Sequence, residues 1–459
     1  MIPSASKLPR STLWLQWIGG VATTTMMFVI GLTFGWASPY LAQFSTGNSP
    51  FPATTSEISW MASMFYLGRL PGAILGFVLN QYFGSKTTMI GTGCGLVLSW
   101  ILIISANSVE WIYAARFIWG SGIELTSISF ALYLGEISSA NIRGALIAMT
   151  MNGLPLGILA GNSIGAYVSM RIFACISLVP TLFFVVVFVL LPESPYHLIK
   201  KSKITEAEKS IMKYNPNSNL SDESKAIQKF VGETNSLNFV NRLRELNVPR
   251  NRKSGLIVIL FFFFAQSCGL NPLAAYMETI VTRGMVTVVS PSTVPIVANG
   301  LGIMAGLAMM YLTEKLGRKK MWIFSSCGIT VAMTALGTHF YLLDDGFDAD
   351  LLQWIPILSM IAFTVCCSLG MYAIPAILIS ELFAANIRTL AASITCASAA
   401  IFALISIEIY QYLLEIINEC YIYWMYAILM VLSAILGSIL IPETKGKTLT
   451  EIQDSMAKM

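Results

Sequence analysis

Twelve runs of about twenty apolar residues constrain the fold of this chain more than any other feature of its sequence. Because unpaired backbone groups cannot face lipid, runs of this length predict membrane-spanning helices. A composition of 55% hydrophobic and 11% charged residues excludes an ordinary water-soluble globule. The predicted spans are residues 13–38, 57–81, 87–106, 110–136, 144–168, 170–191, 254–283, 290–313, 320–342, 351–381, 388–413 and 419–441. We therefore expect an all-α protein of twelve transmembrane helices in a lipid bilayer.

Basic residues mark one side of the predicted spans. Residues 200–253, between the sixth and seventh spans, hold 12 of the 28 lysines and arginines. Lys315, Arg318, Lys319 and Lys320 crowd the connection between the eighth and ninth spans. Because basic loops are retained in the cytoplasm, the pattern places both termini there. These loops also account for the net charge of +4, which gives no reason to expect a nucleic-acid partner.

Two nine-residue segments of the chain are nearly the same. GEISSANIR occupies residues 135–143, and SELFAANIR occupies residues 380–388. GSK and GRK, and PESP and PETKG, recur with a similar spacing. The charged positions of these repeats all lie on the predicted cytoplasmic side, which indicates a latch that forms when this side closes. The similar spacing of the three repeated motifs predicts that a unit of six helices has been duplicated.

Duplication divides the chain into two pseudo-symmetric six-helix bundles. We expect the first at residues 1–191 and the second at 254–441, with a cytoplasmic helical linker at 192–253 and a tail at 442–459. In the linker, residues 204–213 have an amphipathic, helix-favouring composition. Parallel repeats of this kind hold a substrate between halves that open alternately to each side.

The order of the motifs carries a family resemblance. GRLPGAILG, RFIWGSG, GEISSANIRGAL, PESPYHL, QSCGLN, TEKLGRKK, SELFAANIR and PETKG follow one another across nearly the whole chain. In this order they resemble the sugar porter family of the major facilitator superfamily, and most of all its insect facilitated trehalose and hexose transporters. The resemblance implies a facilitative sugar transporter in the plasma membrane that works by alternating access.

The resemblance also implies an inner gate built from charged residues. The matching positions are Glu136, Arg143, Glu193, Glu314, Arg318, Lys319, Glu381, Arg388 and Glu443. The alternative is that these charges are ordinary topology signals at the membrane interface. The first-half copy of the loop motif has Gln81 where the family has an acid and Ser85 where it has a base. We expect a weaker inner gate in that half.

Amides in the seventh span match the family's sugar site. Gln266 and Asn271 are retained there, and Tyr276 takes the place of an aromatic residue. Amide groups both donate and accept hydrogen bonds, so they suit sugar hydroxyls that must leave water. The alternative is a hydrogen bond that only joins neighbouring helices. Gly269 and Pro272 are typical of the broken helices that such gates use, and so is Pro375 in the tenth span.

Three other positions of the sugar site depart from the family pattern. Met151 replaces a glutamine, Gly302 an asparagine and Ala376 a tryptophan. Asn152, beside Met151, and Asn299, one helical turn before Gly302, are expected to substitute for two of them. These losses favour the alternative function of a membrane sugar sensor, or of a divergent relative with an altered substrate and little transport.

Two ionisable residues interrupt the predicted spans. Arg69 lies in the second span and Glu124 in the fourth, at similar depths from the outer face. Because charges in a bilayer are costly and usually paired, we predict an ion pair between them, whose role is structural or lies in substrate or proton handling. Arg116 matches a family arginine near the outer part of the cavity, with outer-gate packing as the alternative role.

The sequence also excludes several classes of protein. The first span contains no acid, and Ala37 stands where proton-driven relatives have one, so downhill transport is favoured. Two histidines without neighbouring ligands give no metal site, and the chain lacks a phosphate-binding GK[ST] loop. We expect no cofactor and no enzymatic activity, and a monomer is the default assembly.

Overall fold

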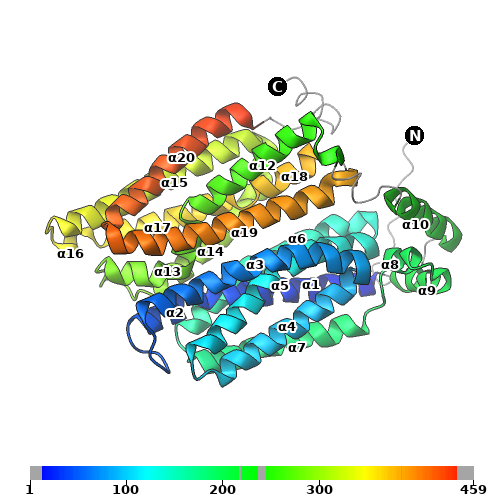
Figure 1. Ribbon diagram of the computed structural model, residues 1–459, viewed down its shortest axis with the longest axis horizontal. Coiled ribbons are helices and arrows are strands. Elements are labelled where there is room, and N and C mark those ends of the chain that lie inside the picture. Colours follow the sequence, from blue (N-terminus) through cyan, green and yellow to red (C-terminus); the bar gives the residue numbers. More distant parts are fainter. Residues whose placement is uncertain (1–12, 217–218, 236–243, 384, 442–459) are drawn as a thin grey trace.

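The computed structural model describes residues 13–216, 219–235, 244–383 and 385–441, and the regular elements in this part of the chain are helices. Twelve spans in it are long and apolar enough to cross a membrane, which confirms the predicted fold class. They lie side by side along the longest axis of the molecule (Figure 1). Their bounds agree with the predicted spans to within three residues, except that the first continues to Ser45.

The first half of the chain forms six spans. The first consists of α1 (Trp14–Gly35) and α2 (Ala37–Ser45), and the others are α3 (Thr55–Phe83), α4 (Ser85–Ser105), α5 (Val109–Ile137), α6 (Ala140–Gly165) and α7 (Met170–Leu190). The first span is longer than predicted because the helix restarts after Trp36, and Pro39 falls in the first turn of α2, where a missing N–H is tolerated.

The second half repeats this arrangement with two broken spans. Its helices are α12 (Pro249–Ser267), α13 (Leu270–Arg283), α14 (Thr293–Leu316), α15 (Arg318–Asp344), α16 (Ala349–Leu352), α17 (Trp354–Cys366), the π-helical turn η2 (Cys367–Met371), α18 (Ile374–Leu382), α19 (Ala385–Ile416) and α20 (Glu419–Leu440). The seventh span breaks at Gly269, whose φ of 89° is left-handed, and the tenth breaks before Pro375 in the first turn of α18. Both predicted breaks are confirmed.

The helices of each half pack mainly against one another. The first half is built on α1 against α6 and α3 against α5, and the second on α15 against α20 and α12 against α19. The halves meet where α3 contacts α19, α2 contacts α13 and α6 contacts α14 (Figure 1).

The turns before α4 and α15 show the duplication at the level of the backbone. Gly84 has φ 87° and ψ 163°, and Gly317 has φ 89° and ψ 164°. A residue with a Cβ atom rarely adopts this conformation, so glycine is needed in both turns. The two loop motifs therefore fold alike, although their charges differ.

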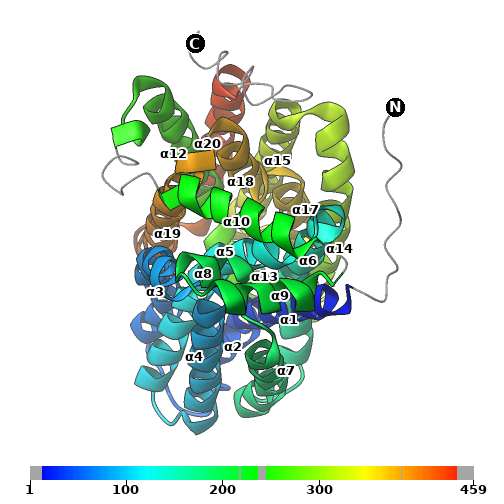
Figure 2. The same cartoon turned by 90° about the vertical axis from the view of Figure 1, so that its right-hand side faces the viewer.

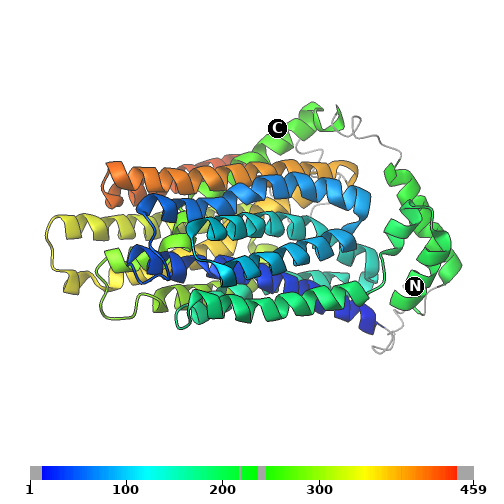
Figure 3. The ribbon, with the colours of Figure 1, turned by 60° about the horizontal axis from the view of Figure 1, so that its bottom comes forward.

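Three short helices cover one end of the bundle, which we call the linker end; the opposite end is the far end. They are α8 (Pro195–Lys200), α9 (Ile204–Tyr214) and α10 (Leu220–Asn235) (Figures 2 and 3). Helix α9 confirms the prediction for residues 204–213. Ile199, Ala207, Ile211 and Ile227 bury a small apolar core between these helices.

Tyr214 attaches the linker helices to the first half. Its hydroxyl donates to the Pro192 carbonyl and contacts the Tyr133 hydroxyl on α5 at 3.0 Å. Its carbonyl accepts a hydrogen bond from Gln16 on α1 at 2.8 Å. Burial raises the pKa of the Tyr214 hydroxyl well above its usual range, so the group stays protonated. The linker helices are thus anchored to two membrane helices of one half.

Candidate transport cavity

A cavity of about 220 Å³ lies between the two halves. Side chains from α1, α2, α3, α5 and α6 line it on one side, and side chains from α12, α13, α14, α17 and the turn after η2 line it on the other. The lining is mainly apolar and aromatic, with a few polar groups, as is usual for small-molecule sites. Because both halves contribute, relative motion of the halves changes the cavity.

Amides from the second half form the polar wall of the cavity. Gln266 lies in the last turn of α12, and Asn271 lies in the first turn of α13, across the break at Gly269. Asn271 Nδ2 donates to the Gln266 carbonyl at 3.2 Å and to Gln266 Oε1 at 3.0 Å. Asn299 on α14 also lines the cavity, while its Nδ2 donates to the Pro295 carbonyl. The structure therefore brings three of the five predicted sugar-site residues together.

The other two predicted sugar-site residues do not line the cavity. From α6, the lining residues are Leu154, Ile158 and Asn162, which recur every four residues. Asn152 lies two residues before Leu154, about 200° around the helix, and its Nδ2 donates to its own helix at Ala148. Its role in sugar binding stays a prediction, and it does not line this cavity.

Tyr276 is not among the lining residues, although it interacts electrostatically with Arg116, which lines the cavity. Asn271 and Ala274 on α13 line the cavity, and Tyr276 lies about 200° around the helix from Ala274. Its ring stacks on that of Tyr410 with centroids 6.0 Å apart, and it is 3% exposed. Its place in the sugar site stays a prediction; the helix restart after Gly269 sets which face of α13 meets the cavity.

Sequence reasoning missed several residues that line the cavity, among them Asn162 and Tyr372. Asn162 is 6% exposed; its Nδ2 donates to the Ile158 carbonyl, and its Oδ1 has no hydrogen-bond partner among the described residues. Tyr372 lies one turn before Ala376 and is 53% exposed. Tyr372 could have been found by the argument that selected Asn299, because it lies one helical turn before Ala376, where the family pattern is lost. Asn162 could be found only by counting two turns from Leu154.

Two positions where the family pattern is lost have different surroundings. Met151 is 54% exposed. Gly302 packs on the tenth span, where an added Cβ would come within 3.1 Å of Thr364 and 3.2 Å of Ser368. A larger side chain at position 302 would therefore displace α17 or η2.

Arg116 on α5 lines the cavity and is 2% exposed. Its guanidinium lies 5.3 Å from the ring centres of both Trp36 and Phe65, and its Nη2 donates to the Ala62 carbonyl at 3.3 Å. Its Nε and Nη1 have no hydrogen-bond partner among the described residues. Aromatic faces supply part of the compensation for burying this charge.

The predicted ion pair between Arg69 and Glu124 is present. Arg69 Nε donates to Glu124 Oε1 at 2.7 Å, and Arg69 Nη2 lies 2.6 Å from the same oxygen. The Arg69 side chain is 14% exposed and lines the cavity, whereas the Glu124 side chain is 4% exposed behind it. The pair therefore places a guanidinium on the cavity wall of the first half.

Close packing of α3 on α5 fixes the position of this pair. A Cβ atom at Gly68 or Gly120 would overlap a backbone carbonyl of the opposite helix, and one at Gly72 would come within 2.7 Å of the Ser121 carbonyl oxygen. Ser121 Oγ donates across the crossing to the Gly68 carbonyl. Small residues let helix backbones approach closely within membranes. Arg69 and Glu124 thus project from two backbones in direct contact.

At the linker end, the equivalent acids of the two halves have different partners. In the second half, Arg318 contacts Glu381 Oε1 through Nε at 3.0 Å and Nη2 at 2.8 Å. In the first half, Ser85 Oγ donates to Glu136 Oε2 at 3.1 Å. The loss of the basic residue at position 85 therefore leaves Glu136 with serine hydroxyls, from Ser85 and Ser194, where Glu381 has an ion pair.

The remaining predicted gate residues are partly described. Arg143 Nη2 donates to the Ser138 carbonyl at 3.1 Å, and Glu193 Oε1 accepts from the Ser194 backbone at 3.1 Å. Lys319 is half-buried. The side chains of Glu314 and Arg388, and all of Glu443, lie outside the part of the chain that the structure describes. The ion pairs among the described residues each join partners within one half or within the linker.

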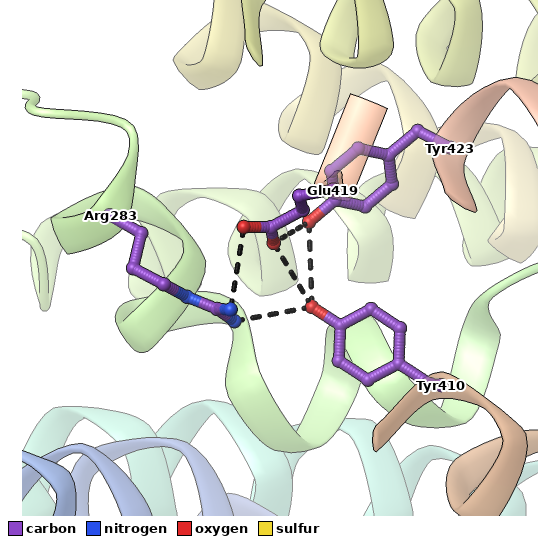
Figure 4. A network of polar contacts seen from close by, with 4 residues as sticks. All are labelled: Arg283, Tyr410, Glu419 and Tyr423. Atoms are coloured by element: carbon purple, nitrogen blue, oxygen red, sulfur yellow. Dashed lines mark hydrogen bonds and ion pairs between the residues drawn. The ribbon is translucent and has the colours of Figure 1, made fainter. Parts of the chain in front are cut away.

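At the far end, a polar network ties α13 to α19 and α20 (Figure 4). Arg283 Nη1 lies 3.3 Å from Glu419 Oε2, and Arg283 Nη2 donates to the Tyr410 hydroxyl at 3.3 Å. The hydroxyls of Tyr410 and Tyr423 donate to Glu419 Oε1 at 3.2 and 2.6 Å. Since Tyr410 also stacks on Tyr276, the network holds the far-end part of the broken seventh span against its own bundle.

The two halves also touch at the far end. The backbone N–H of Glu278 on α13 donates to Ser38 Oγ on α2 at 3.2 Å.

Comparison with known protein families assigns the chain to one of them. The profile described as "Sugar (and other) transporter" matches residues 18–455. The chain belongs to this sugar transporter family. It is accordingly a transporter and not an enzyme.

Relatives of this sugar transporter are known in insects. It is 26% identical to the facilitated trehalose transporter Tret1 of Bombyx mori, over 98% of this chain and 88% of that one. It is 27% identical to Tret1 of Apis mellifera ligustica, over 96% of this chain and 88% of that one. Its fold is that of the xylose transporter XylE from E. coli, whose inward open structure gives a TM-score of 0.74 at 20% identity, covering 97% of this chain and 99% of that one.

Proposed function

We propose that this sugar transporter carries a neutral sugar, a hexose or trehalose, down its concentration gradient by alternating access. The observation that carries the proposal is the shared cavity, in which Gln266, Asn271 and Asn299 face Asn162 and two arginines from the other half. Amides satisfy hydroxyls that would otherwise be buried without partners. The names of the insect relatives support trehalose as a substrate.

Downhill transport follows from where the acids lie. The sequences of α1 and α2 contain no aspartate or glutamate. The residues that line the cavity, within the described part of the chain, also include none. Glu124, an acid behind the wall, is bound by Arg69 through two nitrogens. A proton carrier must exchange its proton with the transport pathway, so this arrangement favours uniport.

The charged residues of the linker end are proposed to form the inner gate. Glu136, Arg143, Glu381 and Arg388 recur in both halves at the same end of the bundle. The linker end is then cytoplasmic, in line with its lysines and arginines, and the plasma membrane is the proposed location. In this scheme the ion pair of Arg318 with Glu381 holds the gate residues of the second half in place. The gate residues of the first half lack such a pair and therefore close less firmly.

A sugar sensor is the second candidate function. It is favoured by the loss of polar or aromatic family groups at Met151, Gly302 and Ala376. A sensor would bind sugar through the same amides but would exchange it slowly across the bilayer. Binding and transport must therefore be measured on the same preparation.

The test is counterflow of radiolabelled glucose, fructose and trehalose in proteoliposomes, with an imposed pH gradient as a separate arm. We expect saturable counterflow of at least one sugar that ignores the gradient and is lost in Gln266→Ala and Asn271→Ala. Asn152→Ala is the matched control, because this side chain lies outside the cavity, and it should retain counterflow. Acceleration by the gradient would refute uniport, and sugar-induced thermal stabilisation without counterflow would identify a sensor.

A further inference from the structure

The two arginines on the first-half wall of the cavity differ in what they can offer a ligand. Arg116 is 2% exposed between Trp36 and Phe65. Arg69 has a side chain that is 14% exposed and lines the same cavity. A ligand in the cavity can therefore reach the guanidinium of Arg69 more readily than that of Arg116.

Glu124 uses one edge of the Arg69 guanidinium and leaves another. Both contacts run from Nε and Nη2 of Arg69 to the single oxygen Oε1 of Glu124. The guanidinium carries five N–H donors in a rigid plane, and Nη1 contributes two of them. Since the pair is neutral as a unit, it presents these donors without adding net charge to the cavity wall. This combination suits an uncharged ligand rich in oxygen acceptors.

The position of the pair is fixed by backbone rather than by flexible packing. The glycines at 68, 72 and 120 bring α3 and α5 into direct contact next to Arg69 and Glu124. A donor on such a rigid support is preorganised, which reduces the entropy lost when a ligand binds. A pair that served only to join two helices would not need one partner to line a cavity.

The polar groups of the cavity are distributed unevenly. Three amides lie on the second-half wall, at Gln266, Asn271 and Asn299, and one lies on the first-half wall, at Asn162. The first half has also lost the family's glutamine at Met151. The other polar residues of that wall are Thr33, Tyr66 and the two arginines. A sugar held between the walls carries hydroxyls on both faces, so these residues must supply hydrogen-bond partners besides Asn162.

We propose that Arg69, oriented by Glu124, is a sugar-binding residue that donates hydrogen bonds to adjacent hydroxyl oxygens of a neutral sugar. A planar guanidinium can reach two neighbouring oxygens at once, which a lysine ammonium cannot reproduce. The role of Glu124 is positioning: it neutralises Arg69 and sets the plane of the guanidinium. This inference rests on the proposed function and adds to it the residue that recognises sugar hydroxyls on the first-half side of the cavity.

The experiment compares two variants. One removes the guanidinium of Arg69 but keeps an ion pair with Glu124, and the other removes both charges. Arg69→Lys keeps a charge for Glu124 but loses the planar fork, and Arg69→Met combined with Glu124→Leu replaces the pair with apolar side chains. Lys203→Met combined with Glu206→Leu is the control, because that ion pair is exposed on the linker helix α9. Thermal unfolding without sugar, sugar-induced stabilisation and counterflow KM are measured for each protein.

We expect both Arg69 variants to unfold near the wild-type temperature without sugar but to bind sugar about tenfold more weakly or worse, the loss typical of one charge-assisted hydrogen bond. The control double variant should bind like wild type. Wild-type affinity in Arg69→Lys overturns the proposal, and so does wild-type affinity in the apolar double variant. If the double variant fails to fold, Arg69→Lys decides the outcome alone, since it retains the ion pair.

Deoxy sugars identify the hydroxyl and separate this inference from the proposed function. Removal of the hydroxyl that Arg69 binds should weaken binding to wild type but should not weaken it further in Arg69→Lys. Additive losses for every monodeoxyglucose would mean that Arg69 contacts none of these hydroxyls and would overturn the inference while leaving sugar transport intact. A wild-type protein that neither binds nor carries any of the three sugars refutes the proposed function, and the inference with it.

Discussion

Arg318 holds Glu381 through two of its nitrogens at the linker end of the second half. The equivalent acid of the first half, Glu136, is held by the Ser85 hydroxyl. Gly84 and Gly317, which precede Ser85 and Arg318, have nearly the same φ and ψ, so the two turns present different side chains from the same backbone conformation.

This asymmetry predicts unequal effects of neutralising the two acids. Glu381→Gln removes a charge from a partly buried pair in which the side chains are 20% and 18% exposed, and should lower the free energy of unfolding by about 1–3 kcal/mol. Glu136→Gln still offers Ser85 an acceptor and should cost less than about 1 kcal/mol. Thermal unfolding of both variants in detergent measures the difference. Equal losses would mean that the Ser85 contact is as strong as the ion pair.

The contact between α3 and α5 predicts intolerance to a single methyl group. Gly120→Ala would drive a Cβ atom into the Phe65 carbonyl, separate the helices and destabilise the protein by about 1–3 kcal/mol. Gly91→Ala is the matched control, because no atom lies within 4 Å of its added Cβ. It should be neutral or stabilise α4 by up to about 1 kcal/mol, since alanine favours helix. The unfolding temperatures of the two variants should therefore move in opposite directions, and a tolerant Gly120→Ala would contradict the close approach.

The network at the far end predicts a large effect of one hydroxyl. Tyr423→Phe removes the 2.6 Å hydrogen bond to Glu419 and should cost about 1.5–3 kcal/mol, as expected for a hydrogen bond to a charged acceptor. Tyr421→Phe, two residues earlier on the same helix, changes a side chain that is 51% exposed and should cost less than about 0.5 kcal/mol. Hydrogen exchange of α13 should rise in the first variant alone. Unchanged exchange there would show that α13 is held by other contacts.

Docking of α8 on the bundle should depend on pH. His197 is buried against Gly84, and burial, with Lys201 and Lys200 nearby, lowers its pKa from 6.5 to about 4. The undocked histidine binds a proton more readily, so docking is strongest above pH 6.5 and weakens as the pH falls toward 4. Hydrogen exchange of α8 amides across this range should show the change. His197→Gln, which does not titrate, should show a much smaller dependence, and an equal dependence would assign the effect to another group.

The sequence predicted the membrane helices well because hydrophobic length is a strong, local signal. It also predicted the ion pair of Arg69 with Glu124, since two charges at matching depths in a bilayer have few other ways to be compensated. The breaks at Gly269 and Pro375 followed from backbone chemistry. Each of these features is determined by the chemistry of one or two residues, so it can be predicted without knowing how the helices pack.

The cavity wall was harder to predict because it depends on helix rotation. Asn152 was assigned to the sugar site as a neighbour of Met151 and Tyr276 by its match to a family aromatic, but each lies about 200° around its helix from a residue that lines the cavity. Asn162 and Tyr372 were missed because the rotation of α6 and the π-helical turn η2 are set by packing across the whole bundle. The one-turn spacing from Ala376 points to Tyr372, but no comparable spacing from a lost family position points to Asn162.

The mutual dependence of Arg69 and Glu124 has a consequence for how this chain could have arisen. Either charge alone in the membrane is strongly unfavourable, whereas neither charge and both charges are acceptable. An ancestor could not have acquired one residue and kept it for long without the other. Descendants of that double change should therefore carry the two residues together. The residues at positions 69 and 124 of related sequences would then separate the lineage that shares this cavity chemistry from those that branched off before it.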